Sequence, residues 1–355
     1  MKHVWSCLSI FCVLLLSGCE HKELCMEHPH LVPVRVETEW NKFGELPMNM
    51  TVLFFPQDTS EVIHIQNYNP RSAKASLPVN TYDVVVHNEL MNELGGIKFR
   101  NINNFSSAEA YACDILAQYS MTKSAEEPVV ADPERLGIAI IRNFEVTQEM
   151  LETYWYQRDM GLQIEENVLK VSPENKVYTI EVKIHARGVQ YVRTVDASLS
   201  GLSEGYMMHS DMPSTQRVTH LIKNWQKVST SDTDPDAGYL RGTCLSFGLP
   251  SNHTAEAAQN ILSMTVLLVD NETVMDYVFQ VGNRFRTEQS NYNPTLRLEI
   301  GKSGTDHSGD IGYNNPNEPI VFPKVKPEGT MDGGLVIDPS FDGDHSIGTG
   351  DFNSK

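Results

Sequence analysis

Apolar and polar residues alternate with a period of two through much of the chain. Val32, Val34 and Val36 are each separated by one other residue, and residues 51–55 form a short apolar run that Pro56 closes. A period of two is expected for a strand with one buried face. The first half of the chain has further segments of this kind at 61–66, 74–77, 82–87, 97–100 and 136–141.

The second half repeats the pattern. Asp270, Asn271 and Glu272 stand between two strand-like segments, and these residue types favour a hairpin turn. Short strands separated by turn residues at regular spacing are typical of β-sandwiches, so the sequence predicts an all-β fold. The expected strands of this half are 177–185, 190–199, 262–269, 274–281 and 296–300.

Two segments are read as helices instead. Residues 147–156 have a helical pattern, and residues 106–109 (Ser-Ser-Ala-Glu) resemble a capping box that would start a helix over 110–119. A surface loop remains the alternative for 110–119.

The first residues resemble a lipoprotein signal peptide. Lys2 gives a positive start, and the apolar run 4–16 is too short for a membrane span, which needs about 20 residues. It ends in Leu16-Ser17-Gly18-Cys19, a lipobox. We therefore expect removal of residues 1–18 and lipidation of Cys19, with an ordinary cleaved signal peptide or an N-terminal helix as alternatives. More than one acyl chain would hold the protein stably at a membrane.

Length and charge limit the number of domains and the kinds of partner that the protein can have. Loss of residues 1–18 leaves 355 − 18 = 337 residues, enough for about two domains. The formal charge of −18 becomes −19 when Lys2 is removed, which argues against a nucleic-acid partner. The expected organisation is signal peptide 1–18, lipidated tether 19–32, N-terminal β-sandwich domain 33–143, C-terminal β-sandwich domain 144–322, and flexible tail or exchanged strand 323–355.

Cysteines are too few to define a framework. Cys7 and Cys12 lie in the expected signal peptide, which leaves Cys25, Cys113 and Cys244 beside the lipidated cysteine. Three widely spaced cysteines form neither a disulfide framework nor a set of paired zinc ligands. One bridge from Cys25 to either of the others stays open.

Two motifs resemble a serine-nucleophile site and a calcium site, but the sequence around each does not match the rest of the pattern. Residues 201–205 match the G-x-S-x-G elbow that holds a serine nucleophile, here Ser203, but no helix start follows and no βαβ units surround it. Asp232, Asp234 and Asp236 alternate as in a calcium loop. Ala237 and Thr243 break that loop at its sixth and twelfth positions, so a solvated acidic hairpin is preferred. The expectation is no catalytic residue, no cofactor and no metal, with these aspartates as calcium candidates.

Several stretches resemble a known family. They are residues 19–25 continuing to 28–30, the strand end at Trp40, residues 77–83, and residues 197–202. In these the chain is similar to Bacteroidales lipoproteins related to the FimB-type accessory and anchor subunits of type V fimbriae. The resemblance covers about residues 19–300 and implies two tandem transthyretin-like β-sandwich domains. It also implies that an edge groove of one subunit accepts a strand from the next, as an exposed sheet edge can.

The resemblance also suggests a role. Arg35 is the first arginine after Cys19, and cleavage there would destroy a predicted strand. This favours an anchor that keeps its lipid over a stalk subunit that loses it. The resulting hypothesis is a non-enzymatic, cell-surface lipoprotein of the outer membrane that binds fimbrial subunits by β-strand complementation and the membrane by its lipid. The alternative is a surface glycan-binding lipoprotein, with Trp40, Trp155 and Trp225 as stacking residues.

Overall fold

β-Strands dominate the structure. The computed structural model describes residues 30–58, 60–115, 127–230, 234, 236–288, 292–302, 314–328 and 346–347. Within these ranges α2 (Gln148–Asp159) is the one α-helix, and short 3-10 turns stand at Trp40–Lys42, Phe105–Ser107, Val189–Tyr191 and Ala257–Gln259. The predicted all-β class is confirmed.

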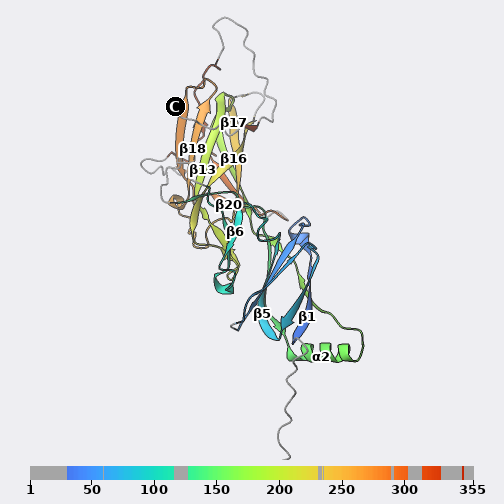
Figure 1. Cartoon of the computed structure of the whole chain (residues 1–355). Coiled ribbons are helices and arrows are strands. Elements are labelled where there is room, and N and C mark those ends of the chain that lie inside the picture. The colour runs from blue at the N-terminus through green and yellow to red at the C-terminus, as the bar shows by residue number, and fades with distance from the viewer. Residues whose placement is uncertain are drawn as a thin grey trace, which may run out of the picture.

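Two sheets form an N-terminal lobe, coloured blue to green in Figure 1. They pack face to face, because alternate residues of β1 such as Val34 meet Val52 and Phe54 of the other sheet in one core. The first sheet has the order β10 (Asn167–Val171), β1 (Leu31–Thr38), β4 (Ser72–Pro78). The second has the order β11 (Glu174–Asn175), β9 (Gly137–Val146), β5 (Asn80–Asn88), β2 (Met50–Pro56), β3 (Ile63–Asn67).

Helix α2 follows β9 and packs on this lobe. Thr147 caps it, since its side-chain oxygen accepts a hydrogen bond from the Met150 N–H at 3.2 Å. Leu151 enters the core and the rest of the helix is mostly exposed. The helix predicted over 147–156 is therefore confirmed.

The C-terminal lobe, yellow to orange in Figure 1, is a second sandwich around its own core. Its main strands follow the order β19 (Val274–Gln280), β18 (Ile261–Leu268), β13 (Val192–Ser203), β16 (Arg217–Ser229), β17 (Ala237–Ser246), β12 (Tyr178–Arg187), β21 (Thr295–Ile300), β20 (Phe285–Glu288). Three two-residue strands are added: β22 (Ile320–Val321) on β12, and β8 (Val129–Val130) and β23 (Ser346–Ile347) on β16.

A small sheet joins the lobes. Its order is β15 (Met212–Pro213), β14 (Gly205–Met207), β7 (Glu109–Ala112), β6 (Ile97–Arg100), so strands from both halves of the chain pair in it. A third core lies beneath, with Phe55 and Ile138 from the N-terminal lobe and Phe247 from the C-terminal lobe. The lobes are thus packed together through buried apolar side chains.

An ion-pair cluster reinforces this joint. Arg100 of β6 binds Glu109 at 2.7 Å and reaches Glu204 at 2.5 Å, a residue that immediately precedes β14. The two carboxylates are 7% and 13% exposed. The hydrogen bond to Glu109 raises the pKa of Arg100 further. Both carboxylates would lack a cation if Arg100 were lost.

Two sequence-based expectations are wrong. Residues 110–112 belong to strand β7 and not to a helix, because Asn104 caps a short 3-10 turn and buried Ala110 then pairs with β6 and β14. The expected domain boundary between 143 and 144 falls inside β9. β10 then returns to pair in parallel with β1, so the N-terminal lobe continues to Asn175.

The lipidation site lies outside the described residues. This holds for the expected signal peptide 1–18, for Cys19 and for the tether up to residue 29. In the part of the chain that is described, no helix has the length and apolar character to cross a membrane. The expected transthyretin-like topology stays a prediction.

Candidate strand-pairing site

The site is built around β16, whose two halves pair with different strands. Residues 217–222 pair with β13, and residues 223–229 pair with β17. The register shifts between Lys223 and Gln226, where Asn224 adopts a φ of 55°. β13 and β17 lie on opposite edges of β16. Residues 217–222 are therefore not paired with β17 on one edge, and most of residues 223–229 are not paired with β13 on the other.

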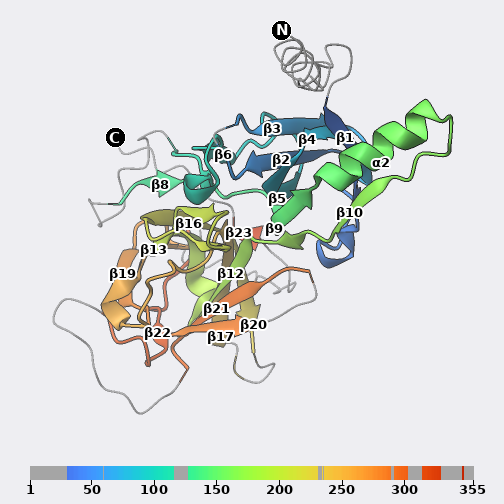
Figure 2. The same cartoon turned by 90° about the horizontal axis from the view of Figure 1, so that it is seen from below.

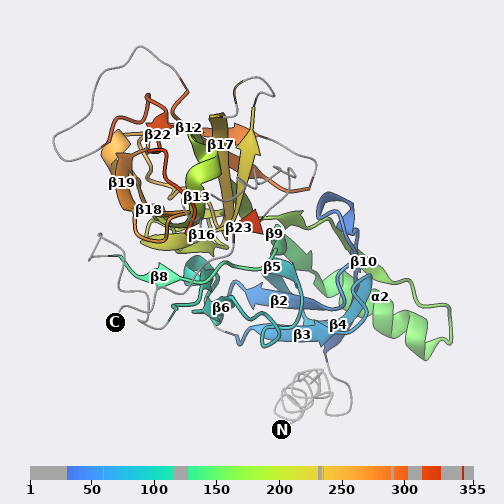
Figure 3. The same ribbon diagram turned by 90° about the horizontal axis from the view of Figure 1, so that it is seen from above.

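One of these edges is paired with the C-terminal tail. Trp225 pairs with Ile347 and Gln226 with Ser346, antiparallel, while Gln226 also pairs with Arg241 of β17. Because a residue has only two edges, β23 occupies the edge on the β13 side. β23 also contacts β13. Figures 2 and 3 both show β23 beside β16. The tail segment thus fills the space where β13 diverges from β16.

The other edge is paired with β8, which comes from the first half of the chain. Val130 pairs in parallel with His220, and the Thr219 N–H donates to the Pro128 carbonyl at 2.9 Å. Side chains hold this segment: the Glu127 carboxylate accepts from the Gly201 N–H at 2.8 Å, and Lys223 lies 3.3 Å from Asp132. β8 is therefore fixed by contacts beyond its two paired residues.

The floor of the site is rigid. Trp225 is fully buried and donates from Nε1 to the Ile222 carbonyl at 3.1 Å. Its ring covers Gly242 so closely that an added Cβ would stand 2.8 Å from it. Lys227 spans the divergence, since its Nζ donates to the Val192 carbonyl of β13 at 3.0 Å, and burial lowers its pKa. The two strands are held apart at a fixed separation.

Ser203 is a structural residue. It lies in β13 and is fully buried, and its hydroxyl donates to the Gly205 and Ser214 carbonyls at 2.9 and 3.0 Å. Strand β14 follows it where a hydrolase elbow needs a helix. His209, a histidine that could have served Ser203 as a base, is exposed and its ring contacts Phe105 at a centroid distance of 5.3 Å. The backbone geometry of the motif is that of a β-bulge.

Two of the three calcium candidates form ion pairs with basic side chains of the chain. Asp234 pairs with Arg187 at 3.1 Å, and Asp236 pairs with Lys324 at 3.2 Å. Hydrogen bonds from Gln190 and Lys324 lower the pKa of Asp236. Asp232 lies outside the described residues. Among the described residues, no three His, Cys, Asp or Glu side chains are grouped to bind a metal.

The tryptophans and cysteines form no common surface. Trp40 and Trp155 contribute to the N-terminal core, whereas Trp225 contributes to the C-terminal one. They therefore do not line one sheet face as a sugar platform would. Among the described residues Cys113 and Cys244 form no disulfide, and burial raises the pKa of Cys244. Pairing of either with Cys25 stays a prediction, because Cys25 is outside the described residues.

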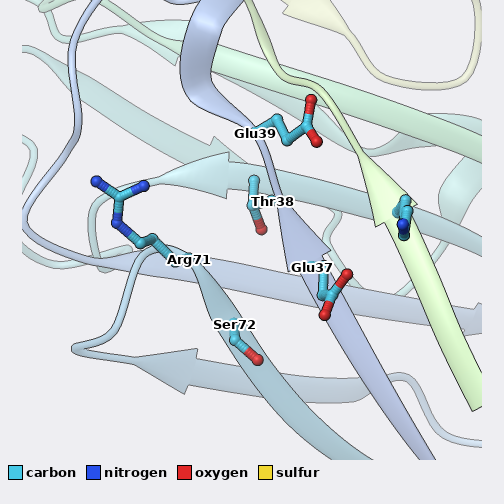
Figure 4. Close-up of a pocket in the computed structure, with 6 residues that line it drawn as sticks. Glu37, Thr38, Glu39, Arg71 and Ser72 are labelled. Atoms are coloured by element: carbon cyan, nitrogen blue, oxygen red, sulfur yellow. The ribbon is translucent and has the colours of Figure 1, made fainter. Parts of the chain in front are cut away.

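A pocket of about 320 Å³ lies at the end of β1, where residues of β1, β4 and β10 meet. Figure 4 shows Arg71 extending away from Glu37 and Glu39, so its charged groups do not converge on one point. A second pocket, of about 490 Å³, is lined by several glutamates. Two of them have internal partners: Glu134 accepts from the Gly96 N–H and Glu93 from Asn49. Neither pocket presents an arrangement for catalysis.

Comparison with known proteins places the chain among fimbrial relatives. A Bacteroides ovatus protein assigned as the fimbrium anchoring subunit Fim4B is 25% identical over 199 residues, which are 55% of this chain and 52% of that protein. The chain thus spans about half the length of the curated relative it matches. This match confirms the resemblance to fimbrial subunits that the sequence indicated.

One solved structure supports the fold. The crystal structure of an adhesin from Bacteroides ovatus has a TM-score of 0.52 at 18% identity and covers 87% of this chain and 98% of its own. The fimbrial anchor protein Mfa2 from Porphyromonas gingivalis has a TM-score of 0.47 at 9% identity and covers 76% of this chain and 90% of its own. A family model described as a domain of unknown function, DUF5119, matches residues 18–223, more than half of the chain. The chain belongs to the DUF5119 family.

Proposed function

We propose that this protein is a non-enzymatic anchor or assembly subunit of a fimbria, located in the cell envelope. It holds its partner by β-strand complementation at β16. The observation that carries the proposal is that Gln226 pairs with Arg241 on one edge and with Ser346 on the other. Ser346 lies 120 positions further along the chain. Main-chain hydrogen bonds at such an edge accept strands of varied sequence, which suits the joining of subunits.

The lipid belongs to the same proposal. Residues 1–18 are removed, Cys19 carries the acyl chains, and residues 20–30 tether the N-terminal lobe to the outer membrane. Support comes from β1: Arg35 lies within a strand that pairs on both edges, with β10 and with β4. Proteolysis at Arg35 would remove the centre of a sheet, so the chain keeps its N-terminus.

The fimbrial names of the relatives support this role. The relative named as an anchoring subunit shares sequence with just over half of this chain, and the adhesin shares its fold. The identity of the partner subunit follows from the experiment below.

A photo-crosslinking amino acid at Gln226 tests the proposal in fimbriated cells. We expect it to capture another fimbrial subunit. Arg297 of β21 provides the matched control, because it is also exposed but both of its neighbours belong to longer strands: Glu181 lies in the ten-residue β12 and Arg286 in the four-residue β20. Equal capture at both positions, or none at Gln226, would contradict strand complementation at β16.

A further inference from the structure

Exposed apolar side chains gather at one end of the N-terminal lobe. Thirteen large apolar residues of the described chain are exposed, and six of them lie in α2, in the segment from α2 into β10, and in the turn between β4 and β5. Tyr156, Met160 and Leu162 are 61%, 62% and 52% exposed. We call the six residues the apolar end surface; they are Val79, Tyr156, Met160, Leu162, Ile164 and Val168.

Strand register places two parts of this surface, Val79 and the residues just before Asn167, beside the point where the chain enters the lobe. β1 begins at Leu31, which pairs with Pro78, next to Val79. β10 runs parallel to β1 with Asn167 opposite Val34, so the residues just before Asn167 lie beside the start of β1. Figure 2 shows α2 and β10 alongside β1 at this end.

The surface is held in a defined shape. Gly161, with a φ of 65°, turns the chain after α2, and the Leu162 N–H donates to the Gln157 carbonyl at 2.8 Å. The Gln157 side chain accepts from the Glu165 N–H at 2.9 Å. A Cβ at Gly161 would meet no atom within 4 Å, so the turn projects from the lobe. These bonds define the turn that carries the exposed Met160 and Leu162.

We infer that the apolar end surface rests on the lipid bilayer beside the acylated cysteine, with its tyrosine and aliphatic side chains in the headgroup region. The inference rests on the proposed lipidation. Only 11 positions separate Cys19 from His30, a reach of about 40 Å at most, so this end of the lobe stays within that distance of the membrane. Tyrosine and apolar side chains are suited to the boundary between water and acyl chains.

The charges around the surface specify the kind of bilayer. Glu149, Glu152, Asp159 and Glu165 are exposed on the same helix and turn, whereas Arg158 is engaged over the Trp155 ring at 4.6 Å. This acidic rim is repelled by anionic headgroups and accepts zwitterionic ones. Contact is therefore strongest on phosphatidylethanolamine and phosphatidylcholine and weakens as anionic lipid is added.

Trp155 is the reporter for the test, because Trp40 and Trp225 are buried inside the lobes. The mature acylated protein is reconstituted in phosphatidylcholine vesicles whose acyl chains carry bromine, which quenches tryptophan at close range. We expect quenching of Trp155 in the wild type and loss of most of it in the variant Met160→Ser/Leu162→Ser/Ile164→Ser. The matched control, Met212→Ser/Val274→Ser/Val321→Ser, replaces three exposed residues of the C-terminal lobe and keeps the quenching.

Sedimentation of the vesicles separates the two claims. Vesicle-bound wild type whose fluorescence equals that of the triple variant overturns the resting surface and leaves the lipid anchor intact. Wild type that does not sediment overturns the anchor, and the inference with it. A triple variant that changes only the oligomeric state assigns the surface to a second copy of the chain and also overturns the inference.

Discussion

β1 and β16 each lie between two neighbours, but their edges are covered in different ways. β1 pairs with β10 from Val34 to Thr38 and with β4 from Leu31 to Glu37. β16 has long partners for half of each edge, and two-residue segments cover part of the rest. A short segment contributes few hydrogen bonds and is the easier one to replace. β1 is thus covered along both edges by strands of at least five residues, whereas part of each edge of β16 is covered by a two-residue segment, and the edge paired with β23 is the one at which we propose strand exchange.

The largest expected effect on stability comes from removing Trp225, the buried residue of β16 that pairs with β23. Trp225→Ala deletes a fully buried indole and leaves a cavity, which costs about 3–5 kcal/mol of unfolding free energy. Urea unfolding measures the loss. Tyr156→Ala, an exposed residue of the N-terminal lobe, serves as the control and changes stability by less than about 0.5 kcal/mol. A small loss for Trp225→Ala would mean that β16 does not depend on this packing.

The joint between the lobes is the next target. Arg100→Ala leaves Glu109 and Glu204 largely buried without their cation, and we expect a loss of about 3 kcal/mol. Arg35→Ala is the control, since the salt bridges of Arg35 are more exposed and are worth at most about 1 kcal/mol. Calorimetry that shows two separate transitions only for Arg100→Ala would support a joint held by this cluster. Equal effects of the two variants would refute it.

The third prediction concerns the pH dependence of the stability of the N-terminal lobe. His87 of β5 is fully buried, and burial lowers its pKa to about 4. The unfolded chain, with an ordinary pKa near 6.5, binds the proton first, so stability falls as the pH drops from about 6.5 towards 4. We expect a loss of about 2 kcal/mol between pH 7 and pH 5. His87→Phe removes this dependence; a wild type with no more pH dependence than the variant would disprove it.

The smallest effect concerns the spacing of β13 and β16. Lys227→Met removes the hydrogen bond from Nζ to the Val192 carbonyl and costs about 1 kcal/mol. Lys183→Met is the control, because the ammonium of Lys183 is partly exposed and makes only weak contacts, a 3.5 Å ion pair with Glu299 and a position 4.4 Å from the Tyr239 ring. Thermal unfolding of both variants measures the difference. Greater destabilisation by Lys183→Met would show that Lys227 does not hold the two strands.

The sequence predicted the regular parts of the fold. Alternation at Val32, Val34 and Val36 marked β1, Thr147 marked the start of α2, and Asp270 marked a hairpin in which its carboxylate accepts from the Thr273 N–H. Each of these signals is local, because it depends on residues a few positions apart. The family resemblance supplied the fimbrial context.

The site itself was harder to predict. β16 and β17 were missed, since β16 contains buried polar residues such as Thr219 and His220 and changes register at Asn224, which disrupts a period of two. β10 was missed because its parallel pairing with β1 joins residues 133 positions apart, Val34 and Asn167. Strand-pairing edges depend on long-range register, which no local pattern contains.

A pair of cysteines tests the edge of β16 most directly. Gln226→Cys with Ser346→Cys places two thiols at directly paired positions, where the Cα atoms of antiparallel strands lie about 4.5–5.5 Å apart, within the range of a disulfide. The account predicts that the purified full chain oxidises to an intrachain bridge, and that an excess of the fimbrial subunit captured at Gln226 prevents the bridge. Arg297→Cys with Ser346→Cys stays reduced in both conditions. Absence of the bridge, or a bridge that the partner does not affect, would contradict an exchangeable strand at this edge.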